Sequence, residues 1–348
     1  MTGVLRTWPT RTNRSRHRVA RAVVLGVMAA LMATGCSRAD VLGVEANTQV
    51  ASDRPALTAN QAQSIAERVL GEASVADALR TSAAMSTAFT GVALRTAASR
   101  YAVEASMESP DERDTGEALQ PPPPPTRVIR TMGAVFPRLI LTVSPAEDEN
   151  TRELAVLSSG SVLDPYKVAS RVRLLPGVVV PDVAPAGAAV LSATGRDGRL
   201  SVSPVDALRD YATLLQTGKS GGTTFADDPV VISVRDNAKQ QASQVSKIAS
   251  FRQTHALTKD QVHVVATRDG GAVVIGALER VDTFTVKKGK GHLAPPAAYK
   301  ALAGGVTKIT KSALVTTVEI VALVIPPDGE GAVQVIGFTE LPESVKAR

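Results

Sequence analysis

The 348-residue chain has very few cysteines and aromatic residues. Cys36 is the only cysteine, so no disulfide can form within the chain and stability must come from the burial of apolar side chains. Phe, Trp and Tyr together make up 3% of the residues, whereas carbohydrate grooves and base-stacking surfaces need exposed aromatic rings. These scarcities argue against a disulfide-stabilised fold, a carbohydrate groove and a nucleic-acid platform.

Histidine is also scarce, and the histidines form no metal-binding pattern. Downstream of Cys36 they are His255, His263 and His292, with no two of them four residues apart and no cysteine beside them. We therefore expect neither a metal nor another cofactor, and a zinc or iron site that draws on His255 and His263 is the alternative. Alternation with apolar neighbours predicts that His263 is a half-buried strand residue, and His255 is predicted to end a helix.

Sequence motifs of two common enzyme classes are missing. Gly218-Lys219-Ser220 looks like the end of a phosphate-binding loop, but that motif needs a glycine five positions earlier, where Thr213 stands. No Gly-x-Ser-x-Gly sequence occurs, and Ser158-Ser159-Gly160-Ser161 lacks its glycine frame. We predict that the protein is not an enzyme. A hydrolase triad that uses His263 or His292 without a known motif is left as an alternative.

The stretch 22–36, AVVLGVMAALMATGC, determines where the protein is located. Its apolar part has 14 residues, whereas a transmembrane helix needs about 20. Six arginines precede it, and no acidic residue occurs before Asp40: Arg6, Arg11, Arg14, Arg16, Arg18 and Arg21. A basic segment, a short apolar run and a small-residue exit form an export signal, so 1–35 is interpreted as a signal peptide. An uncleaved anchor helix is the alternative.

The exit of this signal, Ala33-Thr34-Gly35-Cys36, resembles the lipobox of bacterial lipoproteins, in which small residues precede a cysteine. The resemblance implies cleavage between Gly35 and Cys36 and a diacylglycerol on the Cys36 thiol. Two or three acyl chains hold a protein stably on a membrane. The predicted location is therefore the extracytoplasmic face of the cell membrane, with the membrane as a partner through the lipid anchor.

The basic character of the chain is a property of this signal. The whole sequence has 39 basic and 33 acidic residues, which gives a net charge of +6. Removal of 1–35 removes six arginines and no acidic residue, so the mature chain has 33 residues of each sign. A neutral chain has no net electrostatic attraction to a polyanion, and we expect no nucleic-acid partner.

From Cys36 to Arg348 the chain has 313 residues, a length that favours two domains. We predict a lipidated N-terminus and flexible tether over 36–56, a first α+β domain over 57–183, a linker over 184–200 and a second α+β domain over 201–348. Five prolines, Pro121 to Pro125, end the charged segment 108–126, which is expected to be a disordered, exposed loop. A polyproline ligand for a partner is the alternative.

Each half shows helical patterns first and strand patterns afterwards. A capping Thr58 and apolar periodicity predict a helix from Leu57 that stops at Gly71, and a second helix over 75–89. Ser203 and Pro204 are typical of a helix start, and that helix is expected to end near Gly218. Another helix is predicted over 237–255, and 91–107 fits either a helix or a strand pair. Strands are predicted over 134–143, 152–158, 166–175, 261–267, 272–286, 312–325 and 332–341.

This order predicts an α+β fold of two tandem units, each with one or two helices packed on a curved antiparallel sheet. The shape resembles the nuclear-transport-factor-like and cystatin-like folds, and this resemblance concerns the fold only. The lipobox at Cys36, the segment Ser203 to Lys219 and the strand pair joined by Gly270-Gly271 also resemble a group of actinobacterial surface lipoproteins of uncharacterised function. That resemblance implies a membrane-attached, extracytoplasmic protein with no assigned catalysis.

We therefore expect a lipid-anchored, non-catalytic binding or scaffolding module of the bacterial envelope, with an envelope protein or a ligand as its partner. The first alternative is a small-molecule or lipid binder with a cavity between sheet and helices, which an apolar pocket of several hundred Å³ would favour. The second is an enzyme of unrecognised type, which ionisable cavity residues with opposed pKa shifts would favour. Lys287, Lys288 and Lys290 are candidates for contact with an anionic surface, and a solvated loop is their simpler interpretation.

Overall fold

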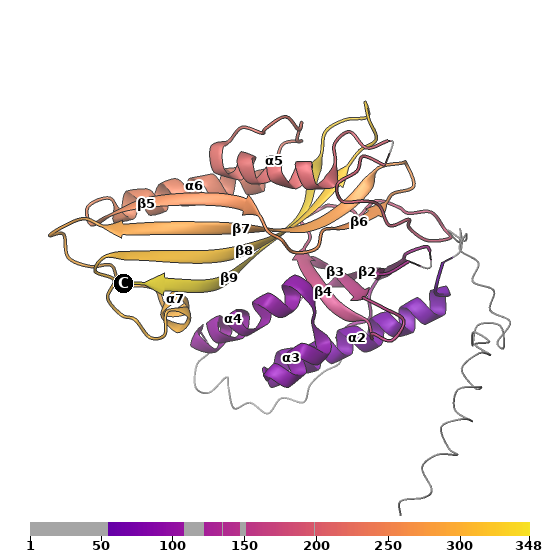
Figure 1. The fold of residues 1–348 in the computed structure, drawn as a ribbon, viewed down its shortest axis with the longest axis horizontal. Helices are drawn as coiled ribbons and strands as arrows, with labels where there is room; N and C mark the ends of the chain where they lie inside the picture. The colour runs from indigo at the N-terminus through magenta and orange to yellow at the C-terminus, as the bar shows by residue number, and fades with distance from the viewer. Residues whose placement is uncertain (1–54, 108–121, 134, 147–150, 198) are drawn as a thin grey trace, which may run out of the picture. The chain divides into compact units, whose positions relative to one another are not determined.

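The computed structural model describes residues 55–107, 122–133, 135–146, 151–197 and 199–348, which lie in one compact unit, Ala51–Arg348. The predictions for the signal peptide, for Gly35 and Cys36 and for most of the tether and the proline-rich loop concern residues outside these ranges. Within them the chain forms helices and two antiparallel sheets, which confirms the predicted α+β class (Figure 1). None of the helices in these ranges combines the length and the apolar content needed to cross a bilayer.

The first sheet is an antiparallel meander of four strands in the order β1-β2-β3-β4. The strands are β1 (Arg127–Arg130), β2 (Arg138–Pro145), β3 (Arg152–Ser159) and β4 (Lys167–Arg173). The sequence predicted β2, β3 and β4 to within a few residues. It did not predict β1, because a four-residue strand next to a proline run is too short to show an alternating pattern.

Three helices precede this sheet: α2 (Ala59–Leu79), α3 (Ser82–Ala88) and α4 (Gly91–Met107). The predicted start of α2 is confirmed, because the Thr58 hydroxyl accepts from the Gln61 N–H and the Gln61 side chain accepts from the Thr58 N–H. The predicted stop at Gly71 is wrong. The buried stripe of α2 continues on both sides of that glycine, with Ala66, Val69, Ala73 and Ala76.

The second sheet pairs four long strands in the order β5-β7-β8-β9, and the short β6 pairs with part of β7. Its strands are β5 (Ala249–Leu257), β6 (His263–Ala266), β7 (Ala272–Val286), β8 (Ser312–Ile325) and β9 (Gln334–Ala347). The helices of this half are α5 (Pro204–Thr217), α6 (Pro229–Val245) and α7 (Ala297–Leu302). As predicted, α5 has Ser203 as its N-cap and ends at Gly218, which adopts the left-handed conformation.

The predicted helix over 237–255 is wrong at both ends. Asp228 accepts from the Val230 N–H and starts α6 eight residues earlier, at Pro229. The helix ends at Val245, and Ala249–Leu257 form a strand because all nine residues pair with β7. His255 therefore lies on β5, an edge strand of the second sheet, and does not end a helix.

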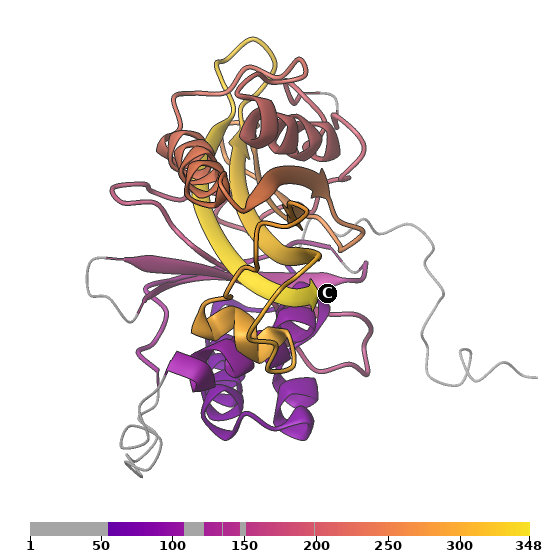
Figure 2. The ribbon, with the colours of Figure 1, turned by 90° about the vertical axis from the view of Figure 1, so that its left-hand side faces the viewer.

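Three apolar clusters define four layers. The first cluster joins the inner faces of the two sheets, with Leu141, Val156, Ile275 and Ile320 among its members. The second packs α5 and α6 on the outer face of the second sheet, and the third packs α2, α3 and α4 on the outer face of the first sheet. The order is thus helices, sheet, sheet, helices. Figure 2 shows the first sheet edge-on between the N-terminal helices and the second sheet.

Part of the predicted linker, 188–191, is paired with both sheets. The Ala188 N–H donates to the Arg130 carbonyl at the end of β1 at 2.9 Å, and the Leu191 N–H donates to the Val264 carbonyl of β6 at 3.1 Å. Ala188 itself is buried. This segment therefore holds one edge of each sheet, while the division into two domains at 184–200 stays a prediction.

Candidate functional site

A cavity of about 520 Å³ lies between helices α2 and α4 and the outer face of the first sheet. We call it the helix–sheet cavity and define it by six of its lining residues: Leu70, Asp77, Arg100, Glu153, Arg171 and Arg173. Ile320 of β8 and Leu341 of β9 also line it, so both sheets contribute to its wall. Its volume lies within the range of about 300–1,000 Å³ that is usual for small-molecule sites.

The register of the first sheet explains why charged residues meet at this cavity. Ser144, Glu153 and Arg173 are cross-strand neighbours on β2, β3 and β4 and therefore share the face that the helices cover. Further along the same face, Ile140, Leu157 and Val168 are fully buried against α2–α4. The covered face thus changes from apolar to charged along its length, and the cavity opens at the charged end.

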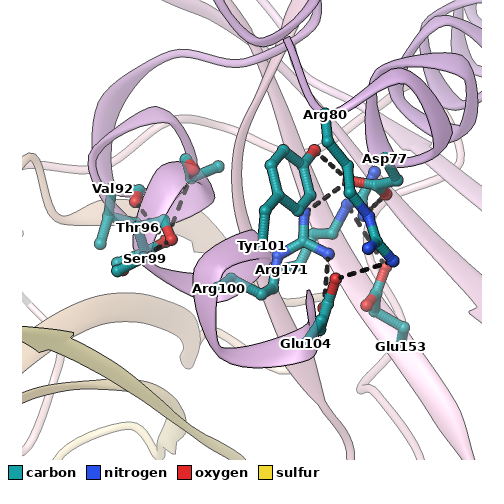
Figure 3. A network of polar contacts seen from close by, with 11 residues as sticks. Asp77, Arg80, Val92, Thr96, Ser99, Arg100, Tyr101, Glu104, Glu153 and Arg171 are labelled. Atoms are coloured by element: carbon teal, nitrogen blue, oxygen red, sulfur yellow. Dashed lines mark hydrogen bonds and ion pairs between the residues drawn. The ribbon is translucent and has the colours of Figure 1, made fainter. Parts of the chain in front are cut away.

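Asp77 of α2 is the centre of a polar network at this end (Figure 3). Its Oδ1 lies 2.5 Å from Arg100 Nη2 and accepts from the Tyr101 hydroxyl at 2.6 Å. Its Oδ2 accepts from Arg171 Nη1 at 2.9 Å. One carboxylate therefore receives hydrogen bonds from α4 and from β4, and it ties two helices to the sheet.

The surroundings of Asp77 keep this carboxylate ionised. Burial alone would raise the pKa of Asp77, but the charges of Arg171 and Arg100 and the hydrogen bonds from Tyr101 and Arg100 outweigh it, so the pKa is lowered. Burial and the Asp77 hydrogen bond raise the pKa of Tyr101, which stays a donor at neutral pH. The network is therefore a set of charge-assisted hydrogen bonds.

Glu104 extends this network toward the end of α2. Its Oε1 lies 3.4 Å from Arg100 Nη1, and its Oε2 lies 3.7 Å from Arg80 Nη2. Arg80 occupies the left-handed position that ends α2, with φ at 53°. The end of one helix is thus held to the side of another by an exposed ion pair.

Glu153 and Arg173 are the two cavity charges that this network does not engage closely. The nearest cation to Glu153 is Arg171, whose Nε lies 3.7 Å away, and burial raises the Glu153 pKa despite that charge. Within the described ranges no carboxylate lies within 4 Å of the Arg173 guanidinium; its backbone N–H donates to Thr339 Oγ1 at 2.8 Å. These two side chains are available to a ligand that brings its own polar groups.

A second charged cluster lies under α6, on the outer face of the second sheet. The buried His255 places Nδ1 2.9 Å from Glu319 Oε2, and its Nε2 lies 3.2 Å from the Gln253 side chain. Arg280 links Glu319, Asp282 and Glu340, and a pocket of about 340 Å³ lies between these strands and the polar side of α6. Burial raises the Asp282 pKa despite Arg280.

The prediction that His263 is a half-buried strand residue is confirmed for the strand, although the side chain is buried further than expected, at 5% exposure. Its Nδ1 has no hydrogen-bond partner among the described residues, and burial lowers its pKa to about 4. It lines a pocket of about 350 Å³ with Lys167 and Asp164. His255 and His263 lie in separate clusters, and no group of three or more His, Cys, Asp or Glu able to hold a metal occurs in the described part of the chain.

The other predicted site residues that the structure describes do not line the cavity. Gly35 and Cys36 fall outside the described ranges. Lys287, Lys288 and Lys290 follow the end of β7, where Lys287 Nζ donates to the Ser246 carbonyl at 2.5 Å. Gly218 ends α5, which confirms that Gly218-Lys219-Ser220 is a helix stop.

Sequence patterns did not point to the cavity residues. Arg171 and Arg173 alternate with Val172, a pattern that indicates a solvent-facing row on a strand. The three helices before the sheet were the available signal, because helices of that length must cover one sheet face and with it any charges there. Which face they cover depends on tertiary packing.

Comparison with known proteins gives a family but no activity. A family model described as "Domain of unknown function (DUF8094)" matches residues 134–341. An "Uncharacterized lipoprotein" of Streptomyces avermitilis is 27% identical over 199 residues, which is 57% of this chain and 58% of that relative's length. No solved structure matches. These similarities confirm the resemblance to uncharacterised actinobacterial lipoproteins.

Proposed function

The chain belongs to the family of the domain of unknown function DUF8094, and from that premise we propose that it is a lipid-anchored, non-catalytic binding module of the bacterial envelope. The anchor is a diacylglycerol on Cys36. The binding site is the helix–sheet cavity, and its ligand is a small amphipathic molecule with an anionic group.

The proposed anchor is supported by two independent observations. The sequence Ala33-Thr34-Gly35-Cys36 resembles a lipobox and follows a basic and apolar segment of signal-peptide type. The Streptomyces relative bears the name of a lipoprotein. A lipid on Cys36 would place the cavity outside the cytoplasm, where envelope lipids and their precursors are the nearest amphipathic anions.

The proposed ligand class rests on one observation, the unengaged charges in the cavity. Among the described residues no carboxylate lies within 4 Å of the Arg173 guanidinium, which can receive an anionic group, while its cross-strand neighbour Glu153, with its raised pKa, can donate or accept a hydrogen bond. Leu70, Ile320 and Leu341 provide apolar wall beside them. A charged head near a short apolar surface is complementary to an amphipathic anion.

The hydrogen bonds that Asp77 accepts favour a binding site over a catalytic site. Its lowered pKa and the raised pKa of Glu153 are the opposed shifts that an acid–base pair in an enzyme would have. However, three donors from Arg100, Tyr101 and Arg171 occupy Asp77, so this carboxylate is not available to take a proton from a substrate. Its proposed role is to position the two arginines.

The anchor is tested by expression of the wild type and of Cys36→Ala in an actinobacterial host, followed by membrane fractionation and intact-mass measurement. We expect a mature chain that begins at a diacylated Cys36 in the membrane fraction, and a Cys36→Ala protein that is absent from the detergent phase. An unmodified cysteine on a chain that retains residues 1–35 would contradict the proposal.

The ligand class is tested by calorimetric titration of the soluble mature chain with octyl phosphate and octanoate. We expect saturable binding, and a loss of affinity of about tenfold or more in Arg173→Gln, because a charge-assisted pair is removed. Arg252→Gln is the matched control, since Arg252 is an exposed arginine on β5. Equal affinity in all three proteins, or no binding of either probe, would contradict the cavity as the site.

A further inference from the structure

Two hairpin loops at one end of the first sheet expose large apolar side chains. In an antiparallel meander the β1–β2 and β3–β4 loops lie at the same end of the sheet. Here Arg138 pairs with Ser159, and Ser158 pairs with Lys167, so both loops begin at this end. Val135 in the first loop is 81% exposed, and Val162 and Leu163 in the second are 79% and 93% exposed. We call Val135, Val162 and Leu163 the docking tips.

Cations and aromatic rings lie directly behind the docking tips. The Arg138 guanidinium stacks on the Phe136 ring at 4.5 Å, and both residues are half-buried. Lys167 begins β4 next to the second loop, and its Nζ donates to the Ser86 carbonyl at 2.6 Å. Tyr166 precedes it, and the acidic Asp164 lies in the same loop. Apolar side chains in front of lysine, arginine and tyrosine form the pattern of surfaces that insert shallowly between lipid headgroups.

The chain enters the folded part at the same end of the sheet. Pro55, the first described residue, forms an antiparallel bridge with Met132, which belongs to the β1–β2 loop. Eighteen residues separate Cys36 from Pro55, a length that reaches at most about 60 Å. The chain that leads to Cys36 therefore joins the fold beside the docking tips.

We propose that the docking tips contact the lipid surface of the membrane that holds the Cys36 anchor, with anionic lipids as the preferred partner of Arg138 and Lys167. This inference rests on the lipid anchor of the proposed function. A tether supplies a high effective concentration, so a contact that is weak by itself is occupied once the anchor is in the bilayer. The docked protein then holds its first sheet end-on to the membrane.

The predicted lysine contact lies at the far end of the second sheet. Lys287 follows Val286, the last residue of β7, and β7 runs for about 45 Å from the end that β6 occupies. β6 meets the segment 188–191, which also bonds Met132 and Arg130 near the docking tips. Figure 1 shows the start of α2 and the outer end of β7 on opposite sides of the fold. Contact through the lysines and contact through the docking tips would therefore place the protein in opposite orientations on the membrane.

The experiment uses two properties of the mature chain. Cys36 is its only cysteine, so its thiol can be coupled to a maleimide lipid in vesicles, and Trp8 is lost with the signal, so an introduced tryptophan is the only one present. Leu163→Trp reports on the docking tips. Ile232→Trp on α6, where the native side chain is 64% exposed, is the matched control, and Lys288→Trp reports on the lysine loop.

With vesicles of phosphatidylcholine and phosphatidylglycerol, we expect the Leu163→Trp emission to shift to the blue and to be quenched by brominated lipid. Ile232→Trp and Lys288→Trp are expected to be unchanged. In the uncoupled Cys36→Ser protein, the vesicle partition coefficient should fall about tenfold or more when Val162 and Leu163 are both replaced by Asp, since two apolar contacts are lost and two like charges face the anionic lipid.

Three outcomes would overturn the inference. The first is no change of Leu163→Trp on the vesicles, and the second is an equal change of all three reporters, which indicates non-specific adsorption. The third is a blue shift of Leu163→Trp that depends on protein concentration without vesicles, which assigns the tips to contact between two copies. Because the lipid is coupled chemically, these results do not depend on whether cells acylate Cys36, which the mass measurement tests separately.

Discussion

At the scale of single residues, Asp77 is the charged group that links α2 to both α4 and β4 near the cavity. It accepts from three side chains on two other elements, and its side chain is 27% exposed. We expect Asp77→Asn to lower the free energy of unfolding by about 2–3 kcal/mol, because Arg100 and Arg171 lose their shared counter-charge. Urea unfolding measures this loss. Asp236→Asn is the control, because Asp236 is 62% exposed in a surface pair with Lys239 and its loss should be close to zero.

The same carboxylate gives a pH dependence with a defined sign. Because the pKa of Asp77 is lower in the folded state than in the unfolded state, its stabilising contribution is complete above the unfolded pKa of about 3.9 and decreases as the pH falls toward the folded pKa. The stability difference between wild type and Asp77→Asn should therefore be constant from neutral pH to about pH 5 and shrink below pH 4. A difference that grows in acid would contradict the assignment.

The buried His263 should make the stability of the fold sensitive to acid at a higher pH than Asp77 does. Its pKa is lowered by burial from 6.5 to about 4, so between these values the unfolded state binds the proton more tightly and stability falls as the pH falls. The loss is about 1.4 kcal/mol per pH unit, or about 3 kcal/mol across the range. Subtracting the pH profile of His263→Gln from that of the wild type should isolate this slope. His292→Gln, which changes an exposed loop residue, should keep the slope.

At the scale of elements, the contact between α5 and β7 depends on a glycine. A Cβ atom at Gly276 would lie 2.4 Å from Leu208 Cδ1, so the fully buried Leu208 occupies the place of a side chain on β7. We expect Gly276→Val to lower stability by about 1–3 kcal/mol through overpacking. In the double variant with Leu208→Ala the combined cost should be smaller than the sum of the two single costs. Simple additivity in urea unfolding would show that the two elements do not meet in this way.

The sequence was sufficient to predict a helix or a strand where one physical signal dominated. β7 and β8 were predicted with the correct bounds, because long β-branched runs between turns fit only a strand. The start and the end of α5 were predicted from Ser203, Pro204 and Gly218. β5 was mistaken for a helix because Val245, Ile248 and Phe251 fit a helical period, whereas hydrogen bonding to β7 determines the structure. Strand pairing is non-local, so no local pattern could reveal it.

The cavity could not be predicted for a related reason. A β-bulge between Val156 and Leu157 changes the pairing with β4, so that Val168 faces the helices and Val172 faces the second sheet. The alternation along β4 therefore does not continue through the strand. Glu153, Arg171 and Arg173 become partners of α2 and α4 through the packing of layers, and sequence spacing contains no record of those distances.

At the scale of the whole molecule, the two halves share one apolar core. The cluster between the sheets contains Leu141, Val156 and Val172 from the first half and Ile275, Val318 and Ile320 from the second, all almost completely buried. Separation at 184–200 would expose this apolar face on each half, and a sheet with helices on only one face needs a cover for the other. The Ala188 and Leu191 hydrogen bonds to both sheets would be lost as well.

We therefore expect that neither 51–183 nor 184–348 alone forms a rigid monomer, although each half has the element order of a complete α+β unit. Each fragment should bind an apolar dye, aggregate or give a poorly dispersed amide NMR spectrum, because the exposed sheet face lacks the side chains that pack against it. Co-expression of the two halves should restore one cooperative unfolding transition and the amide NMR spectrum of the intact chain. A well-dispersed spectrum of the isolated 184–348 fragment would instead establish two autonomous domains and would leave the shared core as an interface between them.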